Sequence, residues 1–163
     1  MADKRFSFSQ DDLKNIAEDI LKFAKKRGAS ACEVDVSEGF GQSVSVRRDE
    51  VDTIEYNRDK GIGVTVYLGQ QKGHASTSDF SESAVQSTVQ AAYDIAKFTA
   101  ADPCAGLAEK KYLYHASSKH ADLDLFHPWE LSTADAIALT LAGEQAAFDA
   151  CKYIKNSDGA SVS

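Results

Sequence analysis

Apolar residues in the first part of the chain recur every three or four positions at first, and then at every second position. The helical spacing extends from about residue 10 to residue 27, with Ser9 and Asp12 suited to a capping box and Gly28 to the C-cap. The alternation of apolar and polar residues that follows predicts half-buried strands. Five strands are expected, over residues 32–36, 44–47, 51–56, 62–68 and 74–78.

Turn-like segments separate these predicted strands. They lie at Gly39–Gly41, Arg48–Glu50, Asn57–Gly61 and Gly69–Gly73. After them, Asp79 and Glu82 suit another capping pair, and a second helix is expected to end at Asp102 and Pro103. A helix, a five-strand meander and a helix predict an α+β domain, in which the two helices cover one face of an antiparallel sheet. The sequence has no GxGxxG or P-loop motif, so no nucleotide cofactor is expected.

Further along, Ser132 and Asp135 suit the N-cap of a third, alanine-rich helix. The segment after it predicts, in order, a strand from Tyr153, a hairpin-type turn at 156–159 and a return strand to Ser163. Because a lone hairpin beside one helix is marginally stable in water, we expect this region to be the truncated start of a second α+β domain. The alternative is a short C-terminal hairpin that adds to the first sheet. The expected division is therefore an N-terminal α+β domain over residues 1–111, then a linker and the truncated beginning of a central domain over residues 112–163.

Composition places the chain among soluble globular proteins. It has 163 residues, of which 43% are hydrophobic, and a net charge of −7. An acidic protein lacks the basic surface that attracts nucleic acid or anionic membranes, so neither partner is expected. No apolar run is long enough to span a membrane, and Met1–Arg5 do not resemble a signal peptide, so a cytoplasmic location is expected. The three widely spaced cysteines predict reduced thiols rather than a disulfide framework.

Residues that could support catalysis are present but are not arranged in a known motif. His74 lies near Ser76 and Asp79, the residue types of a catalytic triad, yet no GxSxG motif accompanies them and we expect a structural role. His115 and His120 are five positions apart, and no HExxH motif occurs, so no zinc site is expected from the histidines. The sequence therefore assigns no catalytic, cofactor-binding or metal-binding residue to this chain.

Arg47, Arg48 and Arg58 are the candidate contact residues. They are expected at the ends of predicted strands, near acidic residues, and exposed cross-strand ion pairs are their ordinary role. The functional alternative is that an exposed edge of the sheet, with these arginines, receives an extended peptide or a protein partner by strand addition.

Several longer motifs together resemble one known family. They are RGASACEV at 27–34, VSVR at 44–47, DKGIGVTVY at 59–67, GHASTSD at 73–79 and DLFHPW at 124–129. These segments are similar to the PmbA-type (TldE-type) branch of the TldD/PmbA modulator-of-gyrase family. The likeness extends from about Ile16 to Ser163 and covers the N-terminal part of the much longer family members.

The resemblance implies a cytoplasmic metalloprotease that acts on unfolded peptides, in which a PmbA-type subunit pairs with a TldD-type subunit. The zinc-binding HExxxH motif of the family belongs to the TldD-type partner, so zinc is expected there and not in this chain. The implied role here is to form part of the peptide chamber and to contact the partner, without a catalytic centre.

A stand-alone peptide-binding or protein-binding regulatory module is the alternative function. The older family name suggests a link with gyrase, but the acidic composition disfavours direct contact with DNA. The possibility that the chain forms a homo-oligomer also stays open.

Overall fold

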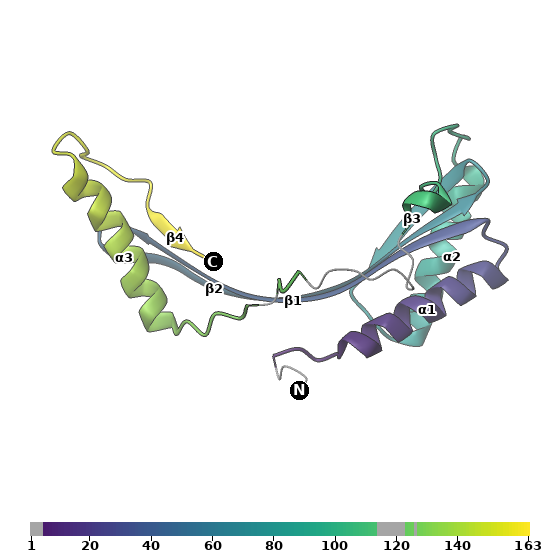
Figure 1. Ribbon diagram of the computed structural model, residues 1–163, viewed down its shortest axis with the longest axis horizontal. Coiled ribbons are helices and arrows are strands. Elements are labelled where there is room, and N and C mark those ends of the chain that lie inside the picture. Colours follow the sequence, from purple (N-terminus) through teal and green to yellow (C-terminus); the bar gives the residue numbers. More distant parts are fainter. Residues whose placement is uncertain (1–4, 114–122, 126) are drawn as a thin grey trace. The chain divides into compact units, whose positions relative to one another are not determined.

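The computed structural model describes residues 5–113, 123–125 and 127–163. The elements are, in order, α1 (Gln10–Lys26), β1 (Ala31–Arg47), β2 (Glu50–Leu68), β3 (Gln71–Thr77), α2 (Glu82–Phe98), the 3₁₀ helix η1 (Lys110–Tyr112), α3 (Thr133–Ala150) and β4 (Ala160–Val162). The strands form one sheet in the order β3-β2-β1-β4, and both β3 and β4 pair antiparallel with their neighbours (Figure 1). The predicted α+β class with an antiparallel sheet is confirmed.

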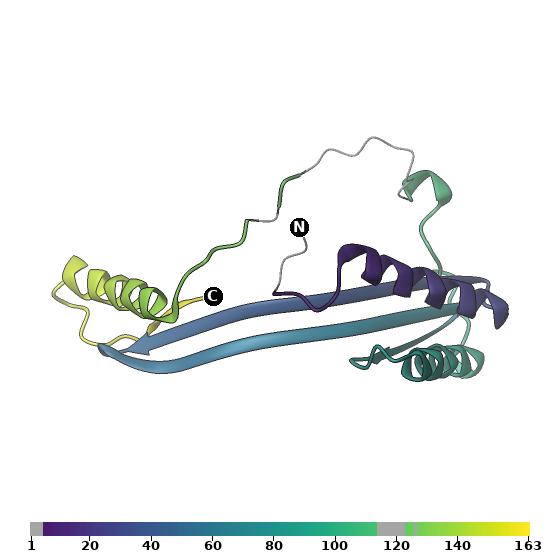
Figure 2. The ribbon, with the colours of Figure 1, turned by 90° about the horizontal axis from the view of Figure 1, so that it is seen from below.

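The expected number of strands is wrong, because two of the predicted turns do not form. The chain stays extended through Gly39–Gly41 and through Asn57–Gly61, so β1 and β2 each replace two expected strands (Figure 2). These glycines are not among the residues with positive φ, so their backbone does not have the conformation that would require a turn. Polar residues in the second segment suggested a corner, whereas they belong to the exposed first part of β2, which stays extended.

The charged corner between β1 and β2 is confirmed. Arg48 and Asp49 have φ values of 53° and 64°, the left-handed conformation of the two central positions of a type I′ turn. Residues other than glycine seldom adopt this conformation, so contacts outside the hairpin are expected to stabilise it.

The N-terminus of α1 has the predicted capping box. The Ser9 hydroxyl accepts the backbone N–H of Asp12 at 3.1 Å, and the Asp12 carboxylate accepts the backbone N–H of Ser9 at 2.9 Å. The predicted cap of α2 is wrong by two residues. Ser81 caps this helix, and Asp79 instead accepts the backbone N–H of Ser81 at 2.8 Å, in a turn that precedes the helix.

The chain forms two compact units. Unit 1 contains residues 1–39 and 59–118, and unit 2 contains residues 40–58 and 119–163, so β1 and β2 contribute to both. The domain boundary expected at residue 111 stays a prediction.

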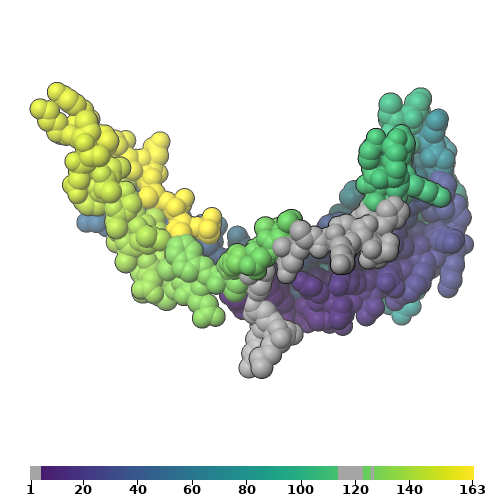
Figure 3. Space-filling view, in the orientation of Figure 1, coloured from purple at the N-terminus to yellow at the C-terminus, as the bar shows by residue number. Residues whose placement is uncertain are grey.

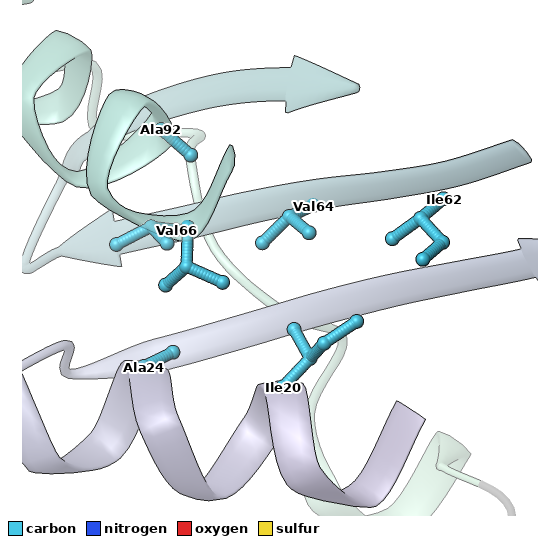
Figure 4. Close-up of a cluster of buried hydrophobic side chains, with 7 residues drawn as sticks. Ile20, Ala24, Ile62, Val64, Val66 and Ala92 are labelled. Carbon is cyan, nitrogen blue, oxygen red and sulfur yellow. The ribbon is translucent and has the colours of Figure 1, made fainter. Parts of the chain in front are cut away.

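The core of unit 1 lies between one face of the sheet and the two helices α1 and α2 (Figure 4). Its buried side chains are Ile20 and Ala24 of α1, Ile62, Val64 and Val66 of β2, and Val89 and Ala92 of α2. Gly73 of β3 brings the strand into close contact with α2, since a Cβ atom there would lie 2.1 Å from the backbone oxygen of Ala92. The prediction that two helices cover one face of the sheet is confirmed.

Unit 2 has a smaller apolar core, formed by α3, β1 and β4. Val44 and Val46 of β1 are 0% and 1% exposed, and they lie opposite Val162 and Ala160 of β4. Ala136 of α3 is also buried. The predicted cap of α3 is confirmed, because the Ser132 hydroxyl accepts the backbone N–H of Asp135 at 3.1 Å.

The predicted C-terminal hairpin does not form. Residues 152–159 are not in a strand, and β4 pairs with β1 instead of with a preceding strand (Figure 1). Gly159, with a φ of 108°, comes just before β4 and lies against the backbone oxygen of Val46. The segment therefore extends the existing sheet as one short strand. Figure 3 shows this C-terminal region in yellow at the surface of the molecule.

Candidate functional site at the end of the β1–β2 hairpin

The three arginines that the sequence singled out do not gather in one place. Arg47 is the last residue of β1 and Arg48 is in the turn, whereas Arg58 lies inside β2 and not at a strand end as expected. At about 3.3 Å per residue, Arg58 is about 26 Å along the strand from Glu50. Only Arg47 and Arg48 therefore belong to one site.

Arg47 and Arg48 bind the loop that leads to β4. The Arg48 guanidinium donates to Oδ1 of Asn156 from Nε at 3.3 Å and from Nη2 at 3.0 Å. Nε of Arg47 donates to the backbone oxygen of Ser157 at 3.3 Å. These contacts replace the cross-strand ion pairs expected for the two arginines, and they connect the end of the hairpin to the loop.

The Glu144 carboxylate of α3 holds the turn from the other side. Its Oε1 accepts the backbone N–H of Arg48 and its Oε2 accepts that of Asp49, both at 3.0 Å. The side chain is buried, with only 4% of the residue exposed. These backbone donors, first Asp49 and then Arg48, lower the pKa of Glu144, with the Ser157 hydroxyl and the Arg47 charge adding to them and desolvation opposing them. A charged carboxylate thus satisfies both amides of the left-handed turn.

Sequence reasoning missed Glu144, Asn156 and Ser157. A signal for Glu144 was available, because Ala136, Thr140 and Glu144 are four residues apart and share one face of α3. All three are buried, so a lone carboxylate on the buried face of an apolar helix indicates a specific partner. Nothing in the local sequence of the loop singles out the other two residues.

The first half of β2 is exposed next to this site. From Glu50 to Lys60 every side chain is exposed, and β3 pairs with β2 only from Ile62 to Leu68. An open depression of about 260 Å³ lies at the beginning of this segment. It is lined by Arg47, Arg48, Glu50, Val51 and Asp52. The hairpin end thus combines a turn held by the Glu144 carboxylate with an exposed stretch of β2 that β3 does not pair with.

The histidines do not form a catalytic or metal site where they can be described. Nδ1 of His74 contacts the Thr65 hydroxyl at 3.0 Å, and His74 also lines an open groove that contains Ser76. Exposed His127 lies 3.7 Å from Asp124, while His115 and His120 are outside the described residues. In the parts of the chain that the structure describes, no three His, Cys, Asp or Glu side chains converge as metal ligands would.

Two groups with raised pKa values are unsuited to act as nucleophiles near neutral pH. Desolvation, helped by the Glu33 charge, raises the pKa of the Cys32 thiol to about 11. The hydroxyl of Tyr67 donates to Glu33 at 2.6 Å, and this hydrogen bond raises the pKa of Tyr67 to about 12. Both groups are therefore neutral and structural.

None of the helices in the described ranges is long and apolar enough to cross a bilayer.

Comparison with known proteins assigns the fold to a family. Residues 32–96 match the family described as PmbA/TldA metallopeptidase domain 1. The chain is 43% identical over 152 residues to the metalloprotease PmbA homolog of Haemophilus influenzae, covering 93% of the chain and 33% of that protein. It is 48% identical over 141 residues to the metalloprotease PmbA of Escherichia coli O157:H7, covering 86% of the chain and 30% of that protein. The chain thus spans about a third of the length of these curated relatives.

Solved structures show the same fold at lower identity. A Bacteroides thetaiotaomicron protein, solved as a candidate modulator of DNA gyrase, superposes with a TM-score of 0.74 at 19% identity, over 94% of this chain and 34% of that one. TldE from Thermococcus kodakarensis superposes with a TM-score of 0.61 at 16% identity, over 84% of this chain and 30% of that one. The chain therefore belongs to the PmbA/TldD metallopeptidase family, of which it carries the first domain.

Proposed function

We propose that this chain is the N-terminal part of a PmbA-type subunit in a cytoplasmic TldD/PmbA peptidase that degrades and matures unfolded peptides. The observation that carries the proposal is the 43% identity to a protein named as a metalloprotease PmbA homolog over 93% of the chain. Since the chain spans about a third of such relatives, we assign the activity to the longer protein and its proposed partner.

The zinc of the proposed complex does not fit the residues described here, because they offer no converging set of three ligands. We therefore assign no hydrolytic step to this chain and propose that a TldD-type subunit binds the metal. The role of this chain is to shape the peptide chamber and to contact that subunit. The hairpin end is the proposed contact, because Glu144 and the 156–157 loop fix its geometry.

The test combines the longer protein that contains this chain with a TldD-type subunit. We expect the two to copurify and to hydrolyse an unstructured peptide in a chelator-sensitive reaction, while the PmbA-type protein alone is inactive. Chelator-sensitive hydrolysis by the PmbA-type protein alone would refute the assignment of zinc to the partner. If the two proteins do not associate, the whole proposal fails.

Substitution of the hairpin arginines tests the contact surface. Arg47→Ala and Arg48→Ala are expected to weaken copurification of the two subunits, with the fold checked by circular dichroism. Lys14→Ala is the matched control, since it removes an exposed cation from α1 in unit 1. Equal copurification of all three variants would place the interface elsewhere.

The open edge of β2 supports a second candidate, a stand-alone module that binds extended peptides. Peptide binding by the chain without any hydrolytic partner in the cell would favour this function. Association with a TldD-type subunit would favour the peptidase.

A further inference from the structure

The edge of β2 between Glu50 and Arg58 has the backbone geometry of a site for an added strand. The sheet order is β3-β2-β1-β4, and β3 pairs with β2 only beyond Ile62, so no described strand pairs with this edge. At about 3.3 Å per residue the open edge is about 26 Å long, enough for a peptide of several residues. Among the described residues, no backbone hydrogen bond from outside the sheet reaches residues 50–57, so their outward N–H and C=O groups can form a backbone ladder with an extended segment.

Apolar side chains along this edge would gain burial from an added strand. Val51, Ile54 and Tyr56 are 44%, 43% and 60% exposed. In contrast, Val44 and Val46 on the neighbouring strand are buried. Cross-strand contacts with β-branched and aromatic residues typically stabilise a pair of strands. The surface that an added strand would cover is therefore partly apolar.

The charge of this edge distinguishes between two possible occupants, a second copy of the same edge and a basic peptide segment. Glu50, Asp52 and Glu55 are exposed, and among the described residues none of them forms an ion pair with a cation. Arg47 and Arg48 are nearby, but their guanidinium groups bind the 156–157 loop. The segment from 50 to 58 thus has three carboxylates and one arginine. A second copy of this edge would place like charges opposite one another, whereas a basic segment would place opposite charges there.

We propose that this edge of β2 binds an extended peptide segment that contains lysine or arginine, as an added strand of the sheet. The inference deepens the proposed function and rests on it for peptide as the class of ligand. It adds the location of the contact and a preference for basic segments. The acidic residues would otherwise serve only to keep the exposed edge from pairing with other chains.

The first experiment uses the unmodified chain and two synthetic peptides of the same length. In one peptide lysine alternates with valine or threonine, and in the other glutamate replaces each lysine. Affinity is measured by fluorescence anisotropy, and backbone amide protection by hydrogen exchange. We expect the lysine peptide to bind at least tenfold more tightly, more weakly at high salt, and to slow exchange at Val51–Tyr56.

A charge-reversal variant with a matched control tests the site on the protein. Glu50→Lys with Glu55→Lys is expected to weaken binding of the lysine peptide at least tenfold. Glu18→Lys with Asp19→Lys makes the same change in net charge on the exposed face of α1, and binding should be unchanged. A lysine peptide with N-methylated amides cannot donate backbone hydrogen bonds, so we expect it to bind much more weakly. Because this comparison uses the unmodified chain, its result does not depend on whether a variant folds.

Three outcomes would overturn the proposal. Equal binding of both peptides would remove the charge preference, and binding without protection of Val51–Tyr56 would place the site elsewhere. Protection of this segment that depends only on the concentration of the chain would identify a second copy as the occupant. Peptide binding at the β2 edge without partner-dependent hydrolysis would refute the proposed function and leave this site standing. Partner-dependent hydrolysis without peptide binding at the β2 edge would refute this site and leave the proposed function standing.

Discussion

Glu144 is a buried carboxylate of unit 2 that accepts hydrogen bonds from the backbone of the Arg48–Asp49 turn. Because its folded pKa is lowered from the ordinary value of 4.5, its contribution to stability is complete above that pH and is lost as the pH falls through the folded pKa. Glu144→Gln offers one oxygen and an amide donor to two backbone donors, so one of them loses its acceptor. We expect the variant to unfold at lower temperature at pH 7, with the difference from the parent chain narrowing in acid.

Thermal melts of both proteins across the acidic range measure this effect. Glu130→Gln is the control, because Glu130 is exposed and lies outside the hairpin contacts. A destabilisation by Glu144→Gln that is the same at every pH would show that shape, and not charge, determines the role of the residue.

Gly73 is a position where backbone packing requires the absence of a side chain. A Cβ atom there would lie 2.1 Å from the Ala92 oxygen and 2.4 Å from the Ala96 nitrogen, both on the backbone of α2. Gly73→Ala must therefore push the helix away, and we expect a loss of about 1–3 kcal/mol in the free energy of unfolding. Gly61→Ala is the control, since no atom lies within 4 Å of its Cβ position and its φ is not positive.

Urea denaturation of the two glycine variants provides the comparison. The control is expected to be neutral or stabilising by up to about 1 kcal/mol, because alanine loses less conformational entropy than glycine in a strand. Equal stability of both variants would mean that α2 can move away from β3 without cost.

At the scale of elements, the two N-caps of unit 1 differ in quality. Ser9 has a reciprocal capping box, whereas Ser81 accepts from Ala84 at 3.4 Å, a long hydrogen bond. We expect Ser9→Ala to lower the free energy of unfolding by about 1 kcal/mol and Ser81→Ala to lower it by less. Ser7→Ala, which removes an exposed hydroxyl ahead of α1, is the control for denaturant unfolding. A larger loss for Ser81→Ala would contradict this ranking.

The helices could be predicted from the sequence because local signals determine them. Ser9 and Ser132 cap α1 and α3 as the sequence predicts, and both helices begin within a residue of the expected position. The strand boundaries could not be predicted in the same way. Glycine permits both turns and extended backbone, so Gly39–Gly41 gave a turn signal where the chain in fact stays extended within β1.

The site was predictable only in part, because its contacts are distant in the sequence. The turn residues Arg48 and Asp49 stood out as a charged corner, but Glu144 and Asn156 lie about a hundred residues later and meet them only in the fold. No local pattern carries such a pairing. The acidic edge of β2 was visible as a sequence of charges, yet its openness depends on where β3 ends.

At the scale of the whole chain, the two units differ in the size of their apolar cores. Unit 1 buries aliphatic side chains from two helices and the sheet. The buried apolar residues of unit 2 are few within the described ranges, and they are Val44, Val46 and Ala136. Because burial of apolar surface is the main source of stability, unit 2 has the smaller reserve against local opening.

Hydrogen exchange followed by mass spectrometry can measure this difference in the intact chain. We expect amides of α3 and β4 to exchange faster than those of α2 and of residues 62–68, since they open without unfolding of unit 1. The gap should widen as the pH falls below the ordinary pKa of Glu144 and through its lowered folded value, after correction for the intrinsic exchange rate, because protonation weakens its hold on the Arg48–Asp49 turn. Glu144→Gln should bring the fast exchange to neutral pH. Equal rates in both units would instead show that the chain opens as one cooperative structure, in which the core of unit 1 also protects the hairpin end.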